Sequence, residues 1–185
     1  WLTSVGEAYV PPGITTPSIQ ASYALSVIGE PALMELTDVL ENADESERIL
    51  AAQTISDMGL RAKEAVPALC KAIKDQSKDV RAQAAEGLGQ ISQGTGDAIP
   101  SLIDALGDRS EDVRRNVSKS IIQLSDNAGD AVYALSKVLN DTNRYVIGNA
   151  VEALYRIGTK ESRSVLLEYL KIARHCPRTF TDSMF

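Results

Sequence analysis

The sequence predicts an all-α protein, folded as a right-handed α-solenoid of about four to five helical hairpins. The first observation is a repeat, because the segment from Ala65 to Ser92 returns, with substitutions, from Ala98 to Ser125, a shift of 33 residues. The second is composition: 44% of the residues are hydrophobic but only 5% are aromatic, which is typical of closely packed helices. The third is the position of Pro and Gly at the ends of the apolar segments, where they start and stop helices.

The chain divides into three expected parts. Residues 1–16 are expected to be an N-terminal segment, the remnant of a preceding repeat whose helix is broken by Pro11, Pro12 and Gly13. The solenoid is expected over residues 17–173, and residues 174–185 are expected to be a C-terminal tail without helical periodicity. Its first helix is expected over about residues 17–28, starting at a proline and ending at Gly29.

The other helices follow from apolar residues spaced three and four apart. In the clearest unit, Val80, Ala84, Leu88 and Ile91 form one apolar stripe. The acidic residues 45–47 are expected to lie in a connection. The expected helices are Pro31–Asn42, Arg48–Met58, Lys63–Ile73, Val80–Ile91, Ala98–Leu106, Val113–Leu124, Ala131–Leu139, Tyr145–Ile157 and about Glu161–Ala173.

Two columns of polar residues recur at the turn inside each hairpin. An Asp at a turn bonds nearby backbone groups, and an Arg beside it offers a planar fork to carboxylates of its own and adjacent repeats. In the last full unit Ile147 replaces the Arg. The columns predict a structural ladder made of Arg48, Arg81 and Arg114 with Asp75, Asp108 and Asp141, and with Asn42 in the first acidic position.

Charge and composition exclude several classes of function. A net charge of −6 and a pI near 4.9 argue against nucleic acid as a partner, since that binding depends on clustered Lys and Arg. Cys70 and Cys176 are the only cysteines, so we expect no disulfide framework and a reducing compartment. No apolar run is long enough to span a membrane. We expect an intracellular location, in the cytoplasm or an organelle stroma, with any targeting segment removed before Trp1.

The second helices carry a recognisable motif, in which Asp-Val-Arg is followed by apolar residues at helical spacing. It resembles HEAT repeats, especially the short HEAT-like repeats of the phycobilin lyase group, and the resemblance covers nearly the whole chain. It implies an α-solenoid of stacked helical hairpins. The matching residues are Asp79, Val80, Arg81, Ala84, Leu88 and Ile91 in one unit and, more loosely, Asp112, Val113, Arg114, Val117, Ile121 and Leu124 in the next.

A few HEAT-like solenoids are enzymes, and this sequence lacks what their chemistry requires. Deoxyhypusine hydroxylases, similar in architecture, need repeated His-Glu pairs to hold two irons, whereas His175 is the only histidine here. HEAT-like DNA glycosylases line one face with basic and aromatic residues, which does not fit an acidic chain. Glu86 and Glu152 belong to repeats two units apart, too far to act as an acid and base pair. We therefore expect no enzyme activity, no metal and no cofactor.

Polar columns are expected on the concave face, if the second helices line it. A solvated surface and a protein-binding face both fit these columns. Aromatic residues of the tail are of the kind that is enriched at interfaces, and with the helix face around Tyr145, Tyr155 and Tyr169 they form an expected contact region. Alternatively, Tyr155 and Tyr169 cap the end of the core. The candidate partner-binding residues are Gln53, Glu86, Gln90, Asn116, Lys119, Gln123, Asn149, Glu152, Arg156, Phe180 and Phe185.

These features indicate a non-catalytic scaffold or adaptor that binds another protein or a multiprotein complex, with an accessory subunit of a larger assembly as one form of that role. The family resemblance implies an alternative, a bilin chromophore lyase subunit that acts on phycobiliproteins. A bilin or another tetrapyrrole would be a ligand only under that alternative, and the sequence shows no evident cluster of residues to hold it.

Overall fold

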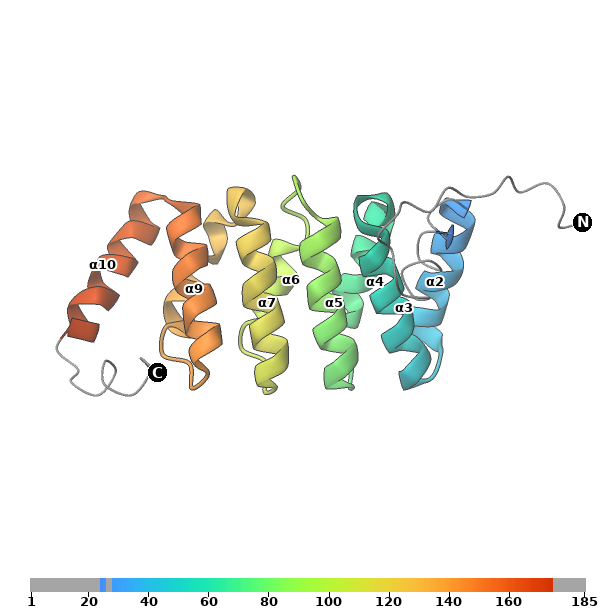
Figure 1. Ribbon diagram of the computed structural model, residues 1–185, viewed down its shortest axis with the longest axis horizontal. Helices are drawn as coiled ribbons and strands as arrows, with labels where there is room; N and C mark the ends of the chain where they lie inside the picture. Colours follow the sequence, from blue (N-terminus) through green and yellow to red (C-terminus); the bar gives the residue numbers. More distant parts are fainter. Residues whose placement is uncertain (1–23, 26–27, 175–185) are drawn as a thin grey trace, which may run out of the picture.

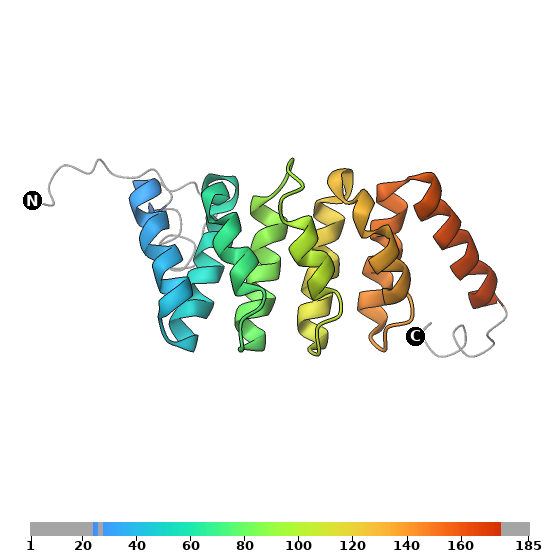
Figure 2. The same ribbon diagram turned by 180° about the vertical axis from the view of Figure 1, so that it is seen from behind.

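The protein is described by a computed structural model that covers residues 24–25 and 28–174. The N-terminal segment 1–16, most of the helix expected over 17–28, and residues 175–185 lie outside the described residues. Two rows of helices stack along one axis (Figures 1 and 2). The helices are α2 (Glu30–Asn42), α3 (Glu45–Met58), α4 (Val66–Ala72), α5 (Lys78–Ile91), α6 (Ile99–Ala105), α7 (Glu111–Gln123), α8 (Val132–Val138), α9 (Arg144–Ile157) and α10 (Lys160–Arg174).

The rows correspond to the two positions in each hairpin. The second helices α3, α5, α7 and α9 lie side by side in one layer, and the shorter first helices lie behind them in Figure 1. Figure 2 shows the first helices from the opposite side. The predicted α-solenoid of helical hairpins is confirmed, and α10 closes the described part at an angle to α9.

The second helices begin earlier than the sequence suggested, because polar side chains cap them. The Asp44 carboxylate accepts a hydrogen bond from the Glu47 N–H at 3.0 Å, so α3 starts at Glu45. The expectation that residues 45–47 form a connection was therefore wrong. Asn143 caps α9 in the same way, through the N–H groups of Tyr145 and Val146.

The helix expected over Lys63–Ile73 was only partly correct. Gly59 ends α3 with φ of 59°, and a 3₁₀ segment over Gly59–Ala65 follows before α4 begins at Val66. The backbone at Ala62 is not helical. Pro67 in the first turn of α4 explains the late start, since proline lacks the N–H that a longer N-terminal extension of the helix would need.

The core runs along the whole stack between the two rows. Many of its residues recur at 33-residue intervals, so successive layers of the core have similar apolar residues at equivalent positions. Fully buried members include Ile55, Leu88, Ile121 and Leu154 on the second helices, and Leu69, Leu102 and Leu135 on the first helices. None of the described helices is long and apolar enough to cross a membrane.

Candidate functional site

A ladder of partly buried ion pairs crosses the turns of consecutive hairpins. The guanidinium of Arg48 donates to both carboxylate oxygens of Asp75 at 3.0 and 3.1 Å. Arg81 makes the same pair of bonds to Asp108, at 2.7 and 2.9 Å, and Arg114 to Asp141, at 2.6 and 3.0 Å. The three Arg and three Asp residues that the sequence placed in two columns thus meet, and each Arg bonds the Asp of the following repeat. The geometry is bidentate, which is the strongest form of this contact.

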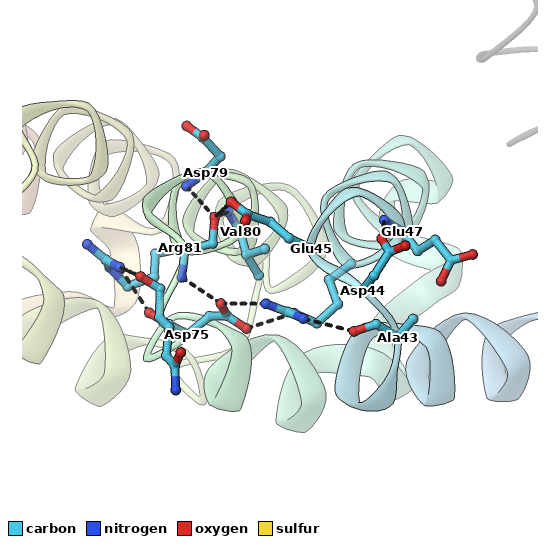
Figure 3. Close-up of polar contacts among 11 residues, drawn as sticks. Ala43, Asp44, Glu45, Glu47, Asp75, Asp79, Val80 and Arg81 are labelled. Atoms are coloured by element: carbon cyan, nitrogen blue, oxygen red, sulfur yellow. Dashed lines mark hydrogen bonds and ion pairs between the residues drawn. The ribbon is translucent and has the colours of Figure 1, made fainter.

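Each rung also fixes the turn of its own hairpin. Figure 3 shows the Ala43 carbonyl and the Asp75 carboxylate on either side of one guanidinium, which belongs to Arg48 and donates to the Ala43 carbonyl at 2.8 Å. One oxygen of Asp75 also accepts from the Ser77 N–H at 2.7 Å. Asp108 and Asp141 bind the N–H groups of Ser110 and Asn143 in the same way. A rung therefore joins two repeats and orders the loop of each.

The electrostatics follow from these contacts. The hydrogen bond to Asp108, opposed by desolvation, raises the pKa of Arg81. Burial by itself raises the pKa of Asp108, but the hydrogen bonds from Arg81 and the Ser110 N–H, together with the positive charges of Arg81 and Arg109, leave that pKa below its ordinary value. For Asp141 the hydrogen bond from Arg114 is the largest effect, and the pKa is lowered. The raised pKa values of Arg81 and Arg114 and the lowered pKa values of Asp108 and Asp141 keep these two rungs charged at neutral pH.

Uncharged residues occupy both ends of the ladder. Asn42 takes the first acidic position, at the end of α2, where its amide donates to Asp38 of the same helix; the residue one period before Arg48 lies outside the described residues. Ile147 takes the last Arg position and is half-buried. No charge is left without its partner at either end of the ladder within residues 28–174.

A second row of contacts links the starts of the second helices. The Ser77 hydroxyl lies 2.6 Å from the Glu45 carboxylate, and the Asn143 amide donates to Glu111 at 3.0 Å. Lys78 interrupts this row, because it stands where the neighbouring repeats have Glu. In the repeat that follows Lys78, the N-cap residue Ser110 makes no side-chain capping bond. The sequence analysis missed this row, although the 33-residue spacing of Glu45, Lys78 and Glu111 was visible.

Several predicted partner-binding residues bind the protein itself. The Asn116 amide donates to the Ala82 carbonyl at 3.0 Å, and Asn149 donates to the Arg115 carbonyl and the Ser118 hydroxyl at 3.3 and 3.1 Å. Lys119 pairs with Glu86 at 3.2 Å, and Arg156 with Glu152 at 2.6 Å. Both ion pairs are exposed enough for solvent to screen them.

The remaining candidate partner-binding residues differ in exposure, and two of them are not described by the structure. Gln53 and Gln123 are exposed and Gln90 is half-buried, all on second helices. These residues and the two ion pairs make up the outward surface of α3, α5, α7 and α9, which we call the second-helix face. Phe180 and Phe185 lie outside the described residues.

The two acidic residues of the second-helix face both take part in ion pairs. Glu86 pairs with Lys119 of the neighbouring second helix, and Glu152 pairs with Arg156 of its own helix. Within residues 24–25 and 28–174 no group of three His, Cys, Asp or Glu side chains could hold a metal ion. Cys70 is a free, half-buried thiol on α4, in the opposite layer.

Sequence reasoning missed a close contact between α5 and α7 at Gly89. A Cβ added at Gly89 would lie 2.6 Å from the Ser120 hydroxyl, and Ser120 donates to the Ala85 carbonyl at 2.7 Å. The small residues Ala82, Ala85 and Gly89 on α5 let α7 approach this closely. Their spacing of three and four was the available signal.

Comparison with known proteins supports this architecture. No curated protein matches the sequence. Solved structures do, including a designed armadillo repeat protein in complex with the peptide (KR)4, at 21% identity and a TM-score of 0.62, with 84% of this chain and 81% of that chain covered. The complex of CpcE and CpcF of phycocyanin lyase from Nostoc sp. matches at 22% identity and a TM-score of 0.63, with 76% and 92% covered.

A third match, a computationally designed armadillo repeat protein for modular peptide recognition, has 24% identity and a TM-score of 0.61 over 83% of this chain and 82% of that one. Identities this low show a shared fold. The sequence itself matches the family model for HEAT repeats over residues 32–123 and 99–175. With its ladder, its 33-residue period and this match, the chain belongs to the HEAT-repeat family.

Proposed function

We propose that this protein is a non-catalytic scaffold that binds another protein through the second-helix face. Exposed and half-buried polar side chains recur at a 33-residue interval on the second helices of four successive hairpins. This alignment is the observation that carries the proposal. Gln53, Glu86, Lys119 and Glu152 form one such row. A partner segment lying across the helices would meet a similar set of groups at every repeat.

The ladder supports this role because it prepares the surface in advance. Each rung holds two repeats in a fixed relation through buried bidentate bonds. A partner that binds a surface already fixed loses less conformational entropy than one that must order it. Many weak polar contacts can then add up to useful affinity.

The two exposed ion pairs suggest how a partner would be recognised. Lys119 and Glu86, like Arg156 and Glu152, contribute little to folding because solvent screens them. Each can exchange its internal partner for a charge on a bound protein at small cost. A segment that carries both acidic and basic side chains fits the face.

The proposal is tested with a photo-crosslinking amino acid placed at Gln53 or Gln123 on the second-helix face. The matched control carries it at Asp104, an exposed residue on α6 in the opposite layer. Extract from the native source is irradiated and crosslinked proteins are identified by mass spectrometry. We expect one protein captured from both second-helix positions and not from Asp104. Equal capture from both layers, or none, contradicts the proposal.

A second candidate function is that of a bilin lyase subunit, which the likeness in fold to CpcE and CpcF of phycocyanin lyase favours. Under that function a tetrapyrrole added to the protein shifts its absorbance, and Arg156→Ala on the second-helix face weakens the shift. Arg163→Ala, an exposed site on α10, is the control. A scaffold gives no shift with any of these chains.

A further inference from the structure

The layer of first helices, which faces the viewer in Figure 2, carries grooves at the junctions between neighbouring hairpins. One lies between α4 and α6 and has a volume of about 560 Å³, and the next lies between α6 and α8 and has a volume of about 610 Å³. A rung of the ladder lines each of them, Arg81 with Asp108 in the first and Arg114 with Asp141 in the second. The α4–α6 groove and the α6–α8 groove are thus copies of one feature, 33 residues apart.

An ion pair bridges the α4–α6 groove. Lys74, in the turn after α4, lies 3.5 Å from the carboxylate of Asp104 on α6, and both residues line the groove. A ligand that entered there would have to displace this pair. The two charges also cancel, so the rim offers neither a cation nor an anion to a ligand.

The α6–α8 groove lacks this bridge because both of its rim positions differ. Gly107 stands one period after Lys74, and Lys137 stands one period after Asp104. A Cβ added at Gly107 would meet nothing within 4 Å, so that side of the rim is open. The Lys137 ammonium lies 4.3 Å from the centroid of the Tyr133 ring, and Tyr133 is 72% exposed. The open rim therefore carries a cation and an aromatic ring side by side.

The walls below this rim are largely apolar, since the two helices expose aliphatic side chains to each other across the groove. They are formed by Ile103 and Leu106 on the α6 side and by Ala134 and Val138 on α8. An apolar body that fills the space between these walls removes their surface from water.

Most charged groups in the lining of the α6–α8 groove are matched within the protein. Asp108 and Asp141 are held by the bidentate arginine contacts of the ladder, and Asp104 pairs with Lys74. Lys137 has no carboxylate partner in the described part of the chain, where its close contact is the Tyr133 ring. The charge that remains for a ligand at this groove is therefore positive.

We propose that the α6–α8 groove binds a small aromatic carboxylate. The carboxylate pairs with the Lys137 ammonium, and the aromatic ring lies against the apolar walls beside Tyr133. The volume of about 610 Å³ is within the range of about 300–1,000 Å³ that is usual for small-molecule sites. The groove lies in the layer opposite the second-helix face, so this site does not depend on the proposed scaffold function.

The test uses three probes that share a phenylpropyl body and differ in charge: phenylpropionate, phenylpropanol and phenylpropylamine. Each is titrated into the full chain, and binding is followed by nuclear magnetic resonance from the backbone amides of Gly107, Ala134 and Lys137. We expect phenylpropionate to shift these signals and to bind about fivefold more tightly than phenylpropanol, the effect of one exposed ion pair. The cationic amine should bind more weakly than the alcohol.

Two substitutions at Gly107 separate the open rim from other effects. Gly107→Glu places a carboxylate across from Lys137, where it rebuilds the kind of bridge that Lys74 and Asp104 form in the other groove. We expect it to abolish the shifts caused by phenylpropionate. Gly107→Ala leaves the rim open and should bind as the wild type does.

A second pair of variants tests the charge of the site. Lys137→Gln should lower the affinity for phenylpropionate to that for phenylpropanol. Lys119→Gln, at an exposed lysine in the opposite layer, is the control and should change neither. Signals away from the groove show that each variant is folded.

The proposal is overturned if phenylpropionate shifts no signal of the groove even at the highest concentration used. Equal affinities for the three probes, or an unchanged affinity of Lys137→Gln for phenylpropionate, would show apolar adsorption without recognition of the carboxylate and overturn it as well. Binding that survives Gly107→Glu would place the probe outside the groove, with the same consequence.

Discussion

Arg81 donates two hydrogen bonds to the carboxylate of Asp108, at 2.7 and 2.9 Å, across 27 residues of sequence. Its remaining terminal nitrogen donates to the carbonyls of Asp75 and Gln76 at 2.9 and 3.0 Å. One side chain, only 5% exposed as a residue, thereby ties the α5 helix to the turns of two hairpins. A substitution in this central rung of the ladder should therefore disturb both hairpins.

Replacing Arg81 by Ala should lower the free energy of unfolding by about 3 kcal/mol, because it leaves the Asp108 carboxylate without its partner in a largely buried site. Arg81→Lys should also lose most of this stability, since an ammonium cannot make the forked contact with Asp108. The measurement is urea unfolding followed by circular dichroism. Lys74→Ala, which removes an exposed ion pair with Asp104, is the control and should change stability by less than about 1 kcal/mol. Similar losses for both variants would contradict the structural role of the rung.

The lowered pKa values of Asp108 and Asp141 predict how stability depends on pH. A carboxyl group with a lower pKa in the folded state stabilises the protein above its ordinary pKa of 3.8, and that contribution is lost as the pH falls through the folded value. Stability should therefore fall steeply below about pH 4. Asp141→Asn should be less stable at neutral pH and show a shallower decline in acid. A decline as steep as the wild type's would show that Asp141 is not responsible for it.

Two glycines should respond in opposite ways to Ala. At Gly89 the new methyl group would lie 2.7 Å from Ser120 Cβ and would also press on the Gln123 amide, so we expect a loss of about 1–3 kcal/mol. At Gly148 the new methyl group meets nothing within 4 Å, and the gain in helix propensity should stabilise the protein by up to about 1 kcal/mol. Thermal unfolding of dilute samples measures both. An increase for Gly89→Ala would mean that α5 and α7 are not as close as described.

Two buried serines should also differ. The hydroxyl of Ser92 has no hydrogen-bond partner among the described residues, so Ser92→Ala should leave stability unchanged or raise it by about 1 kcal/mol. Ser120→Ala removes the bond to the Ala85 carbonyl and should cost about 1 kcal/mol. The denaturant midpoints of the two variants, compared with that of the wild type, measure both changes in stability. A clear loss at Ser92 would indicate that its hydroxyl has a partner after all.

Much of the fold followed from local signals that the repeat amplifies. Leu88 and Ile121 could be assigned to the core because an apolar residue recurs at the same helical position in each unit. The first residues of α3 and α5 were harder to predict, since Asp44 and Ser77 cap a helix only once the backbone N–H groups are in place. The 3₁₀ segment before α4 left no periodic signal at all.

The sequence by itself determined the family, the two-row stack and the residues of the ladder, because a 33-residue period places equivalent residues of neighbouring hairpins side by side. Only the tertiary structure decided which Arg meets which Asp and that Asn116 and Asn149 bind backbone carbonyls of the preceding helix. It also decided that Tyr155 is open to solvent. The physical reason is that a period fixes which residues face one another, whereas distances between helices depend on the small side chains, such as Gly89, that lie between them.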